Sequence, residues 1–234
     1  MKRIYIPTQS PSDWQSLLAQ PTLHWKAGFS AMATAACWED CNPDLPPEIT
    51  ATLTASGIPD LLDLELLAAM PERVTALPGG GAPSHTDVLA LTRSKRGLVV
   101  LSVEAKVDES FGPTVGAKRK NATQGQLKRI AYMECVLGLS EPLADSIRYQ
   151  LVHRAVAAVL NARTFHARAG VMLVHSFSPT GKSRADFDAF VEAVSAQQRT
   201  SDLYELTVPD GPRIFAGWCQ GPCKYLEVDL SGAR

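Results

Sequence analysis

The chain has 234 residues, of which 45% are hydrophobic and 20% charged, and its formal net charge is -1. This composition excludes a disordered chain, and the length suffices for a sizeable core. The near-zero net charge excludes an overall basic surface for nucleic acid, so any such surface would have to be local. No apolar run is as long as a membrane span, and the first residues lack the apolar segment of a signal peptide. We therefore expect a cytoplasmic protein with reduced cysteines and no membrane partner.

The first 60 residues are predicted to be helical and interrupted by prolines. WQSLLAQ and SAMATAACWED have the pattern of helices, and DLLDLELLAAM at 60–70 predicts an amphipathic helix ended by Pro71. We interpret residues 1–60 as a helical extension packed on an α/β core over residues 61–234.

The pattern then changes to strands, which we expect at 72–77, 85–92 and 98–107, joined by a glycine-rich loop and a tight polar turn. Helices are expected at about 121–138 and 144–163, then a buried strand at 170–177, a helix at 184–197, and strands near LYELTV and RIFAGWC. This order predicts an α/β fold with a mixed central sheet and flanking helices.

Two cysteine pairs raise the question of zinc. Cys37-x3-Cys41 and Cys219-x3-Cys223 could supply four thiolates, but structural zinc sites usually carry tighter pairs on turns. Separate free thiols are the simpler interpretation. His175, at the end of its strand, also has two possible interpretations, as a buried core histidine or as a residue of a functional site.

The apolar run LVVLSV leads directly into Glu104 and Lys106. In a strand, residues two apart share a face, so these two side chains point the same way. If the preceding hairpin is centred between Lys95 and Arg96, Asp87 lies opposite Glu104, with Cβ atoms about 4.5–5.5 Å apart. A slip of one residue would instead send Asp87 to the other face.

Two facing carboxylates repel each other unless a cation lies between them. Mg²⁺ is commonly held by one or two carboxylates together with several waters, and it activates water and polarises phosphate oxygens. Lys106 would then orient the attacking water or stabilise negative charge. The alternative is that these charges mark only where the strand reaches solvent. On the repulsive interpretation, removing Asp87 or Glu104 should not unfold the protein.

An Asp on the second strand followed by Glu-x-Lys on the third resembles the PD-(D/E)XK nuclease superfamily. Asp87, Glu104 and Lys106 match its motif, and Glu65, on the expected preceding helix, matches the extra acidic residue of many members. The resemblance implies a restriction-endonuclease-like core, Mg²⁺ or Mn²⁺ held by Asp87, Glu104 and Glu65, and phosphodiester hydrolysis in DNA or RNA. It also leaves open a non-catalytic interaction protein that retains the fold.

Nucleic acid would be contacted by residues that follow the motif. Gln150, His153 and Arg154 share one helix face, so Gln150 could assist catalysis while His153 and Arg154 touch phosphate. Lys118, Arg119 and Lys120 form a basic patch suited to phosphate contacts. Solvated surface charges are the alternative. Acidic Asp108 and Glu109 disfavour binding of bare DNA, and the Gln-x3-Tyr pattern of one branch is missing.

A narrower resemblance runs through most of the chain. The segments PGGGAPSHTDVLAL, VEAKVDESFG, RYQLVHR and VMLVHSFS are similar to an uncharacterised bacterial family of unknown function. That resemblance implies no substrate, and homo-oligomerisation stays open.

Overall fold

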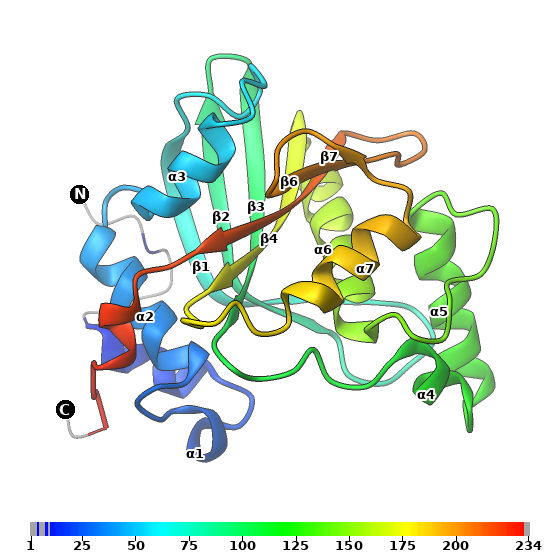
Figure 1. Ribbon diagram of the computed structural model, residues 1–234, viewed down its shortest axis with the longest axis horizontal. Coiled ribbons are helices and arrows are strands. Elements are labelled where there is room, and N and C mark those ends of the chain that lie inside the picture. Colours follow the sequence, from blue (N-terminus) through cyan, green and yellow to red (C-terminus); the bar gives the residue numbers. More distant parts are fainter. Residues whose placement is uncertain (1–3, 5–7, 9, 232–234) are drawn as a thin grey trace.

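A seven-stranded mixed sheet forms the centre of the computed structural model, which describes residues 4, 8 and 10–231 (Figure 1). The strand order is β1-β2-β3-β4-β7-β6-β5. The strands are β1 (Glu65–Thr75), β2 (Ser84–Ser94), β3 (Gly97–Lys106), β4 (Ala169–Ser176), β5 (Gln197–Gln198), β6 (Leu203–Leu206) and β7 (Arg213–Gln220). Strands β3, β4 and β7 are parallel to one another, and the remaining neighbours are antiparallel. The predicted α/β fold with a mixed central sheet is therefore confirmed.

Helices cover both faces of the sheet (Figure 1). On one side lie α4 (Val115–Arg119), α5 (Gln124–Val136), α6 (Tyr149–Thr164) and α7 (Arg184–Ala193). On the other lie the 3-10 helix η1 (Pro11–Leu17), α1 (Pro21–His24), α2 (Ser30–Cys41), α3 (Pro47–Thr54) and, near the C-terminus, the 3-10 helix η2 (Cys223–Leu226). Parallel strands need cover on both faces, which explains why every residue of β4 is buried.

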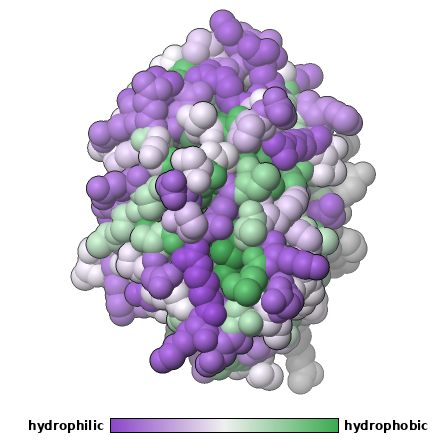
Figure 2. Space-filling view, turned by 90° about the vertical axis from the view of Figure 1, so that its right-hand side faces the viewer, coloured by the Kyte–Doolittle hydropathy of each residue, from purple (hydrophilic) through white to green (hydrophobic). Residues whose placement is uncertain are grey.

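Alternate residues of the central strands belong to two apolar cores. Val100 and Val174 pack with the helices that follow the hairpin, and Leu101 and Leu173 pack with the N-terminal helices. The surface on the α4–α7 side is mostly hydrophilic, with a smaller hydrophobic area near its middle (Figure 2). The N-terminal helices thus form one layer of a three-layer arrangement. The proposed boundary at residue 60 stays a prediction.

The helix predicted over residues 60–70 is wrong. Residues 65–75 form β1, which pairs with β2 along its length, and Pro71 lies within that strand. Leu, Ala, Glu and Met are good helix formers, but ordinary residues differ in helix propensity by less than about 1 kcal/mol each, so strand pairing and burial outweigh this preference. Pro71 is tolerated because β1 is at the edge of the sheet order, where a missing N–H is accommodated.

The predicted register of the β2–β3 hairpin is confirmed. Val88 pairs with Val103 and Ser94 with Gly97, so Lys95 and Arg96 form the turn. Elements further along differ mainly in their bounds: α5 and α6 begin later than expected, and the segment WQSLLAQ falls mostly in η1 rather than in an α-helix. Among the described residues, no helix is long and apolar enough to cross a membrane.

Candidate functional site

Three acidic residues lie in a row across the first three strands. On β2, Asp87 is the next residue beyond the Val88–Val103 pair, and the register therefore places it opposite Glu104 on β3. On β1, Glu72 lies opposite Asp87, because the residues on either side of Glu72 pair with the residues on either side of Asp87. The three acids line one pocket of about 610 Å³. The Ala105 amide donates a hydrogen bond of 2.7 Å to Asp87 Oδ2, which fixes that carboxylate beside β3.

Glu104 is buried at the floor of this pocket and bound by three side chains. Lys106 Nζ lies 2.8 Å from Glu104 Oε1, and Gln150 Nε2 donates to the same oxygen at 2.7 Å. Arg154 Nε donates to the other oxygen, Oε2. Two of these partners come from α6, so the helix face predicted from Gln150, His153 and Arg154 does approach the motif.

The three carboxylates are electrostatically unequal. Burial and the charge of Asp87 raise the pKa of Glu72 to about 9, and burial and the charge of Glu104 raise the pKa of Asp87 to about 7. Burial alone would raise the pKa of Glu104, but the charges of Arg154 and Lys106 outweigh it and lower that pKa to about 2. At neutral pH, Glu104 is therefore ionised, whereas Glu72 holds a proton.

Lys106 stays protonated although it is only 6% exposed. Burial alone would lower its pKa, but the charges of Glu104 and Asp87 hold that pKa above its ordinary value. Its ammonium group also lies 5.2 Å from the centre of the Phe111 ring. Lys106 is thus a fixed cation that can orient a water molecule or an anionic oxygen, and it cannot serve as a base.

The α6 side of the pocket carries further polar groups. His153 Nδ1 and the Ser84 hydroxyl are 3.0 Å apart, and Arg154 Nη1 donates to the same hydroxyl at 2.8 Å. Burial, followed by the charge of Arg154, lowers the pKa of His153 to about 3, so this ring is neutral. Lys118 also lines the pocket, with its ammonium group 5.5 Å from the Tyr149 ring centre.

Three residues predicted for the site lie away from it. Glu65 forms an exposed ion pair with Arg93 at the other end of β1, so its expected role on a helix beside the motif is lost with that helix. Arg119 binds Glu134 and Asp145. Lys120 is exposed and, like Glu65 and Arg119, does not line the pocket.

The acidic pair that follows the motif is tied into the fold. Glu109 accepts hydrogen bonds from the Val107 amide and from the Ser30 amide at the start of α2, at 2.7 and 2.9 Å. Asp108 accepts one from the Ser178 hydroxyl at 2.9 Å. These carboxylates hold loops and a helix terminus in place, and Glu109 also lines the pocket.

Glu72 is the site residue that sequence reasoning missed. The β1–β2 hairpin is centred between Gly79 and Gly80, so the centring argument that paired Asp87 with Glu104 would also have paired Glu72 with Asp87. The sequence places Glu72 on the expected strand at 72–77, but the role of additional acid fell to Glu65, on the helix wrongly expected over residues 60–70. Glu72 also has a left-handed φ of 51°, a conformation that costs a non-glycine residue about 1–3 kcal/mol and is often found at functional sites.

Chemically, Glu72, Asp87 and Glu104 supply carboxylate oxygens of the kind that a hard divalent cation prefers, although among the described residues the oxygen atoms of all three do not lie within 4.8 Å of one another. Asp87 and Glu72 are suited to this role because each is an acid that lacks a Lys or Arg ion pair among the described residues. Glu104 would first have to release one of its present partners. The pocket thus combines oxygen ligands, a fixed ammonium group and a neutral imidazole.

Comparisons with known proteins assign the chain to a family but give no information about its reaction. No curated protein and no solved structure matches the chain. A family model described as a domain of unknown function (DUF6946) matches residues 7–223. The chain therefore belongs to this family of domains of unknown function.

Proposed function

We propose that this protein is a metal-dependent phosphodiesterase that hydrolyses DNA or RNA in the pocket above Glu72, Asp87 and Glu104. The observation that carries the proposal is the alignment of Asp87 and Glu104 on neighbouring strands, with protonated Lys106 on the same face. A relationship to PD-(D/E)XK nucleases is part of this proposal, as is the use of Mg²⁺ or Mn²⁺.

In this proposal, Asp87 and Glu104 hold the cation and Glu72 replaces Glu65 as the additional acid. The bound cation would supply Lewis-acid activation of water and of the scissile phosphate. Lys106 positions the attacking water, and Gln150 holds the orientation of Glu104 through its 2.7 Å hydrogen bond. Lys118, His153 and Arg154 lie on the side where phosphate oxygens would approach.

A second function is favoured by one specific observation. Both carboxylate oxygens of Glu104 are already satisfied by Lys106, Gln150 and Arg154. A buried acid with such partners needs no ion, as expected for a non-catalytic binding module that retains the pocket. Under this alternative, ligand binding would be indifferent to Mg²⁺.

The deciding experiment is cleavage of labelled single- and double-stranded DNA and RNA with Mg²⁺, Mn²⁺ or EDTA. We expect metal-dependent cleavage by the wild type, and its loss in Asp87→Asn and Lys106→Ala. Lys95→Ala is the matched control, because Lys95 forms an exposed ion pair with Asp63 in the hairpin turn region. Activity that survives in Lys106→Ala and in Glu104→Ala would indicate a contaminating nuclease, whereas activity that survives in Lys106→Ala alone would contradict the role proposed for Lys106.

Calorimetric metal titration distinguishes the two functions. Asp87→Asn should weaken Mg²⁺ binding, whereas Lys106→Ala should retain or strengthen it, because removal of a nearby positive charge favours a cation. A wild type that neither binds Mg²⁺ nor cleaves any of the four substrates would contradict the proposed hydrolase and favour the binding module.

A further inference from the structure

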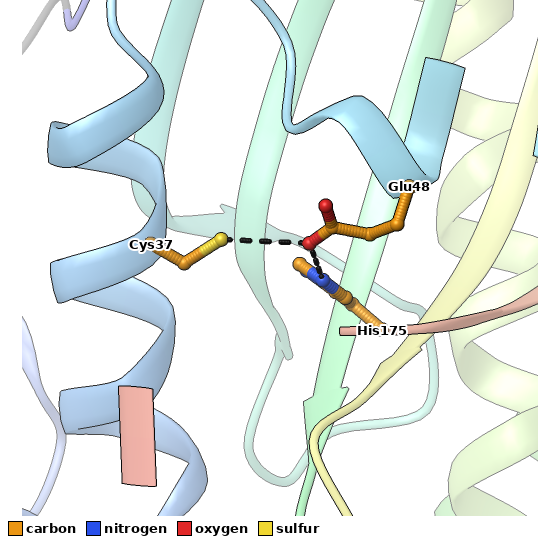
Figure 3. Close-up of side chains that lie close together, drawn as sticks. All are labelled: Cys37, Glu48 and His175. Atoms are coloured by element: carbon orange, nitrogen blue, oxygen red, sulfur yellow. Dashed lines mark hydrogen bonds and ion pairs between the residues drawn. The ribbon is translucent and has the colours of Figure 1, made fainter. Parts of the chain in front are cut away.

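A second group of polar side chains lies on the opposite face of the sheet from the pocket. Cys37 comes from α2, Glu48 from the first turn of α3, and His175 from the end of β4 (Figure 3). Their sulfur, oxygen and nitrogen ligand atoms all lie within 4.8 Å of one another. Two consecutive helices and a strand that is distant in sequence thus bring a thiol, a carboxylate and an imidazole close together.

The group is linked through Glu48. His175 Nε2 lies 2.8 Å from Glu48 Oε1, and Cys37 Sγ donates to the same oxygen at 3.6 Å (Figure 3). Cys37 and His175 are fully buried, and the Glu48 side chain is 14% exposed. This shielding is typical of a closed structural site and unsuited to a catalytic cysteine, which needs access to substrate.

The imidazole ring of His175 is tightly packed by its neighbours. Phe177 packs against it with ring centres 4.4 Å apart, and a Cβ added at Gly221 would lie 2.7 Å from His175 Nε2. His175 Nδ1 is buried and has no hydrogen-bond partner among the described residues. Packing, rather than a second hydrogen bond, therefore aims Nε2 at Glu48.

A fourth donor is close to this group. Cys41 follows Cys37 by one turn of α2, and the two thiols interact. Cys41 is only partly buried and lies outside the group of ligand atoms within 4.8 Å of one another, so its side chain would have to turn toward Glu48 and His175 to complete the site. The four-cysteine zinc site considered from sequence does not form, since neither Cys219 nor Cys223 belongs to the described group of converging ligands.

We propose that Cys37, Glu48 and His175, completed by Cys41, bind a structural Zn²⁺ ion that ties the N-terminal helices to β4. Thiolate, imidazole and carboxylate together are a typical zinc ligand set, and thiolates disfavour Mg²⁺ and Ca²⁺. Binding releases the thiol protons of Cys37 and Cys41, moves the ring proton of His175 from Nε2 to Nδ1, and frees Glu48 from its hydrogen bonds. Two thiolates and one carboxylate carry three negative charges against the two positive charges of Zn²⁺, so the occupied site keeps one net negative charge, on a ligand set whose Glu48 and Cys41 side chains are partly exposed.

The test begins with the zinc content of the purified full-length chain. We expect about one zinc per chain, bound tetrahedrally with thiolate ligands. After removal of metal with a chelator, Zn²⁺ should raise the melting temperature of the Asp87→Asn variant, whose pocket has lost a proposed Mg²⁺ ligand, and Mg²⁺ should raise that melting temperature much less. Titration with Co²⁺ should give the intense visible bands of a tetrahedral site and sulfur-to-cobalt charge transfer.

Variants identify the ligands. Cys37→Ser and Glu48→Gln should weaken Zn²⁺ binding by more than the about 10- to 100-fold that loss of an outer hydrogen-bond partner costs. Cys41→Ser provides a variant at a partly buried position if Cys37→Ser fails to fold. Cys135→Ser removes an exposed thiol from α5 and should bind Zn²⁺ like the wild type, as should Asp87→Asn.

Several results would overturn the proposal. A stripped wild type that shows no Zn²⁺-dependent stabilisation and no cobalt–thiolate absorption would leave the three side chains as a hydrogen-bonded core group. Binding that is unchanged in Glu48→Gln and in both cysteine variants would place the ion elsewhere. Binding that is unchanged in Cys41→Ser alone would overturn the assignment of the fourth ligand.

Discussion

At the scale of single residues, the pocket contains acids with opposite preferences. Glu104 is stabilised as an anion by Arg154 and Lys106, whereas Asp87 and Glu72 are stabilised as neutral acids by burial. Facing carboxylates were expected from the sequence, but their inequality follows from Arg154, which reaches Glu104 from α6. Removal of each acid should therefore have a different effect on stability.

Glu104→Gln should destabilise the protein by about 3–5 kcal/mol, because it leaves buried Lys106 and Arg154 without their counter-charge. This differs from the expectation drawn from the sequence alone, which did not foresee Arg154 as a partner. Urea denaturation measures the change. Glu65→Gln is the matched control and should cost about 0–1 kcal/mol, because its ion pair with Arg93 is exposed. A similar small loss for both variants would contradict the assigned network.

Asp87→Asn should stabilise the metal-free protein at alkaline pH. The folded-state pKa of Asp87 is raised from 3.8 to about 7, so its contribution is complete below about pH 4 and is lost as pH rises through about 7. The variant should thus exceed the wild type by about 4 kcal/mol at about pH 8.5 and differ little near pH 4. Denaturation in EDTA at both pH values measures this. An advantage independent of pH would show that Asp87 does not titrate as assigned.

At the scale of elements, the glycine-rich loop between β1 and β2 is held by one side chain. Arg129, on α5, donates hydrogen bonds to the carbonyl oxygens of Leu77, Pro78, Gly81 and Ala82. Gly79 makes a close approach to the same helix, since an added Cβ would lie 2.1 Å from the Gly125 carbonyl oxygen. The loop that lines the pocket is therefore anchored rather than free.

Arg129→Met should release this loop and destabilise the protein by about 3 kcal/mol, because charged hydrogen bonds are lost and the buried Leu77 carbonyl loses its Arg129 donor. Hydrogen exchange of residues 78–83 should accelerate more than exchange in β4. Lys128→Met, at the exposed neighbouring position, should change stability by no more than about 0.5 kcal/mol. Unchanged exchange in the Arg129 variant would rule out the anchoring role.

At the scale of the whole molecule, one sheet separates two sites. The acids of the pocket point toward α6, while His175, on the next strand, belongs to the face covered by α2 and α3. The N-terminal helices contribute to both sites, because the start of α2 lines the pocket and the middle of α2 carries Cys37. We expect this layer to unfold together with the sheet.

Leu53→Ala in α3 tests this expectation. Leu53 is fully buried against the sheet, so the cavity should cost about 2–5 kcal/mol and shift the whole unfolding transition. Leu23→Ala, at a position that is 52% exposed, is the control and should shift it by no more than about 0.5 kcal/mol. Circular dichroism and tryptophan fluorescence should report one transition. Two separated transitions would show that the N-terminal helices unfold independently.

Local pattern alone predicted much of this protein. The alternation and turn residues around Lys95 and Arg96 determined the hairpin register, and this register brought Asp87 beside Glu104 with Lys106 on the same face. The apolar run of β4 and the helical pattern around Gln150 were equally readable, because periodicity reports which face is buried. The α/β class followed from the order of these elements.

Tertiary structure alone decided the remaining features. Residues 60–70 have helical composition, and only pairing with β2 makes Glu65–Thr75 a strand, which removes Glu65 from the pocket and brings in Glu72. The partners of Glu104 on α6 and the meeting of Cys37, Glu48 and His175 depend on how distant elements pack. The periodicity of a sequence shows which face of each helix or strand is buried. It does not show which other element covers that face, and these contacts depend on that pairing.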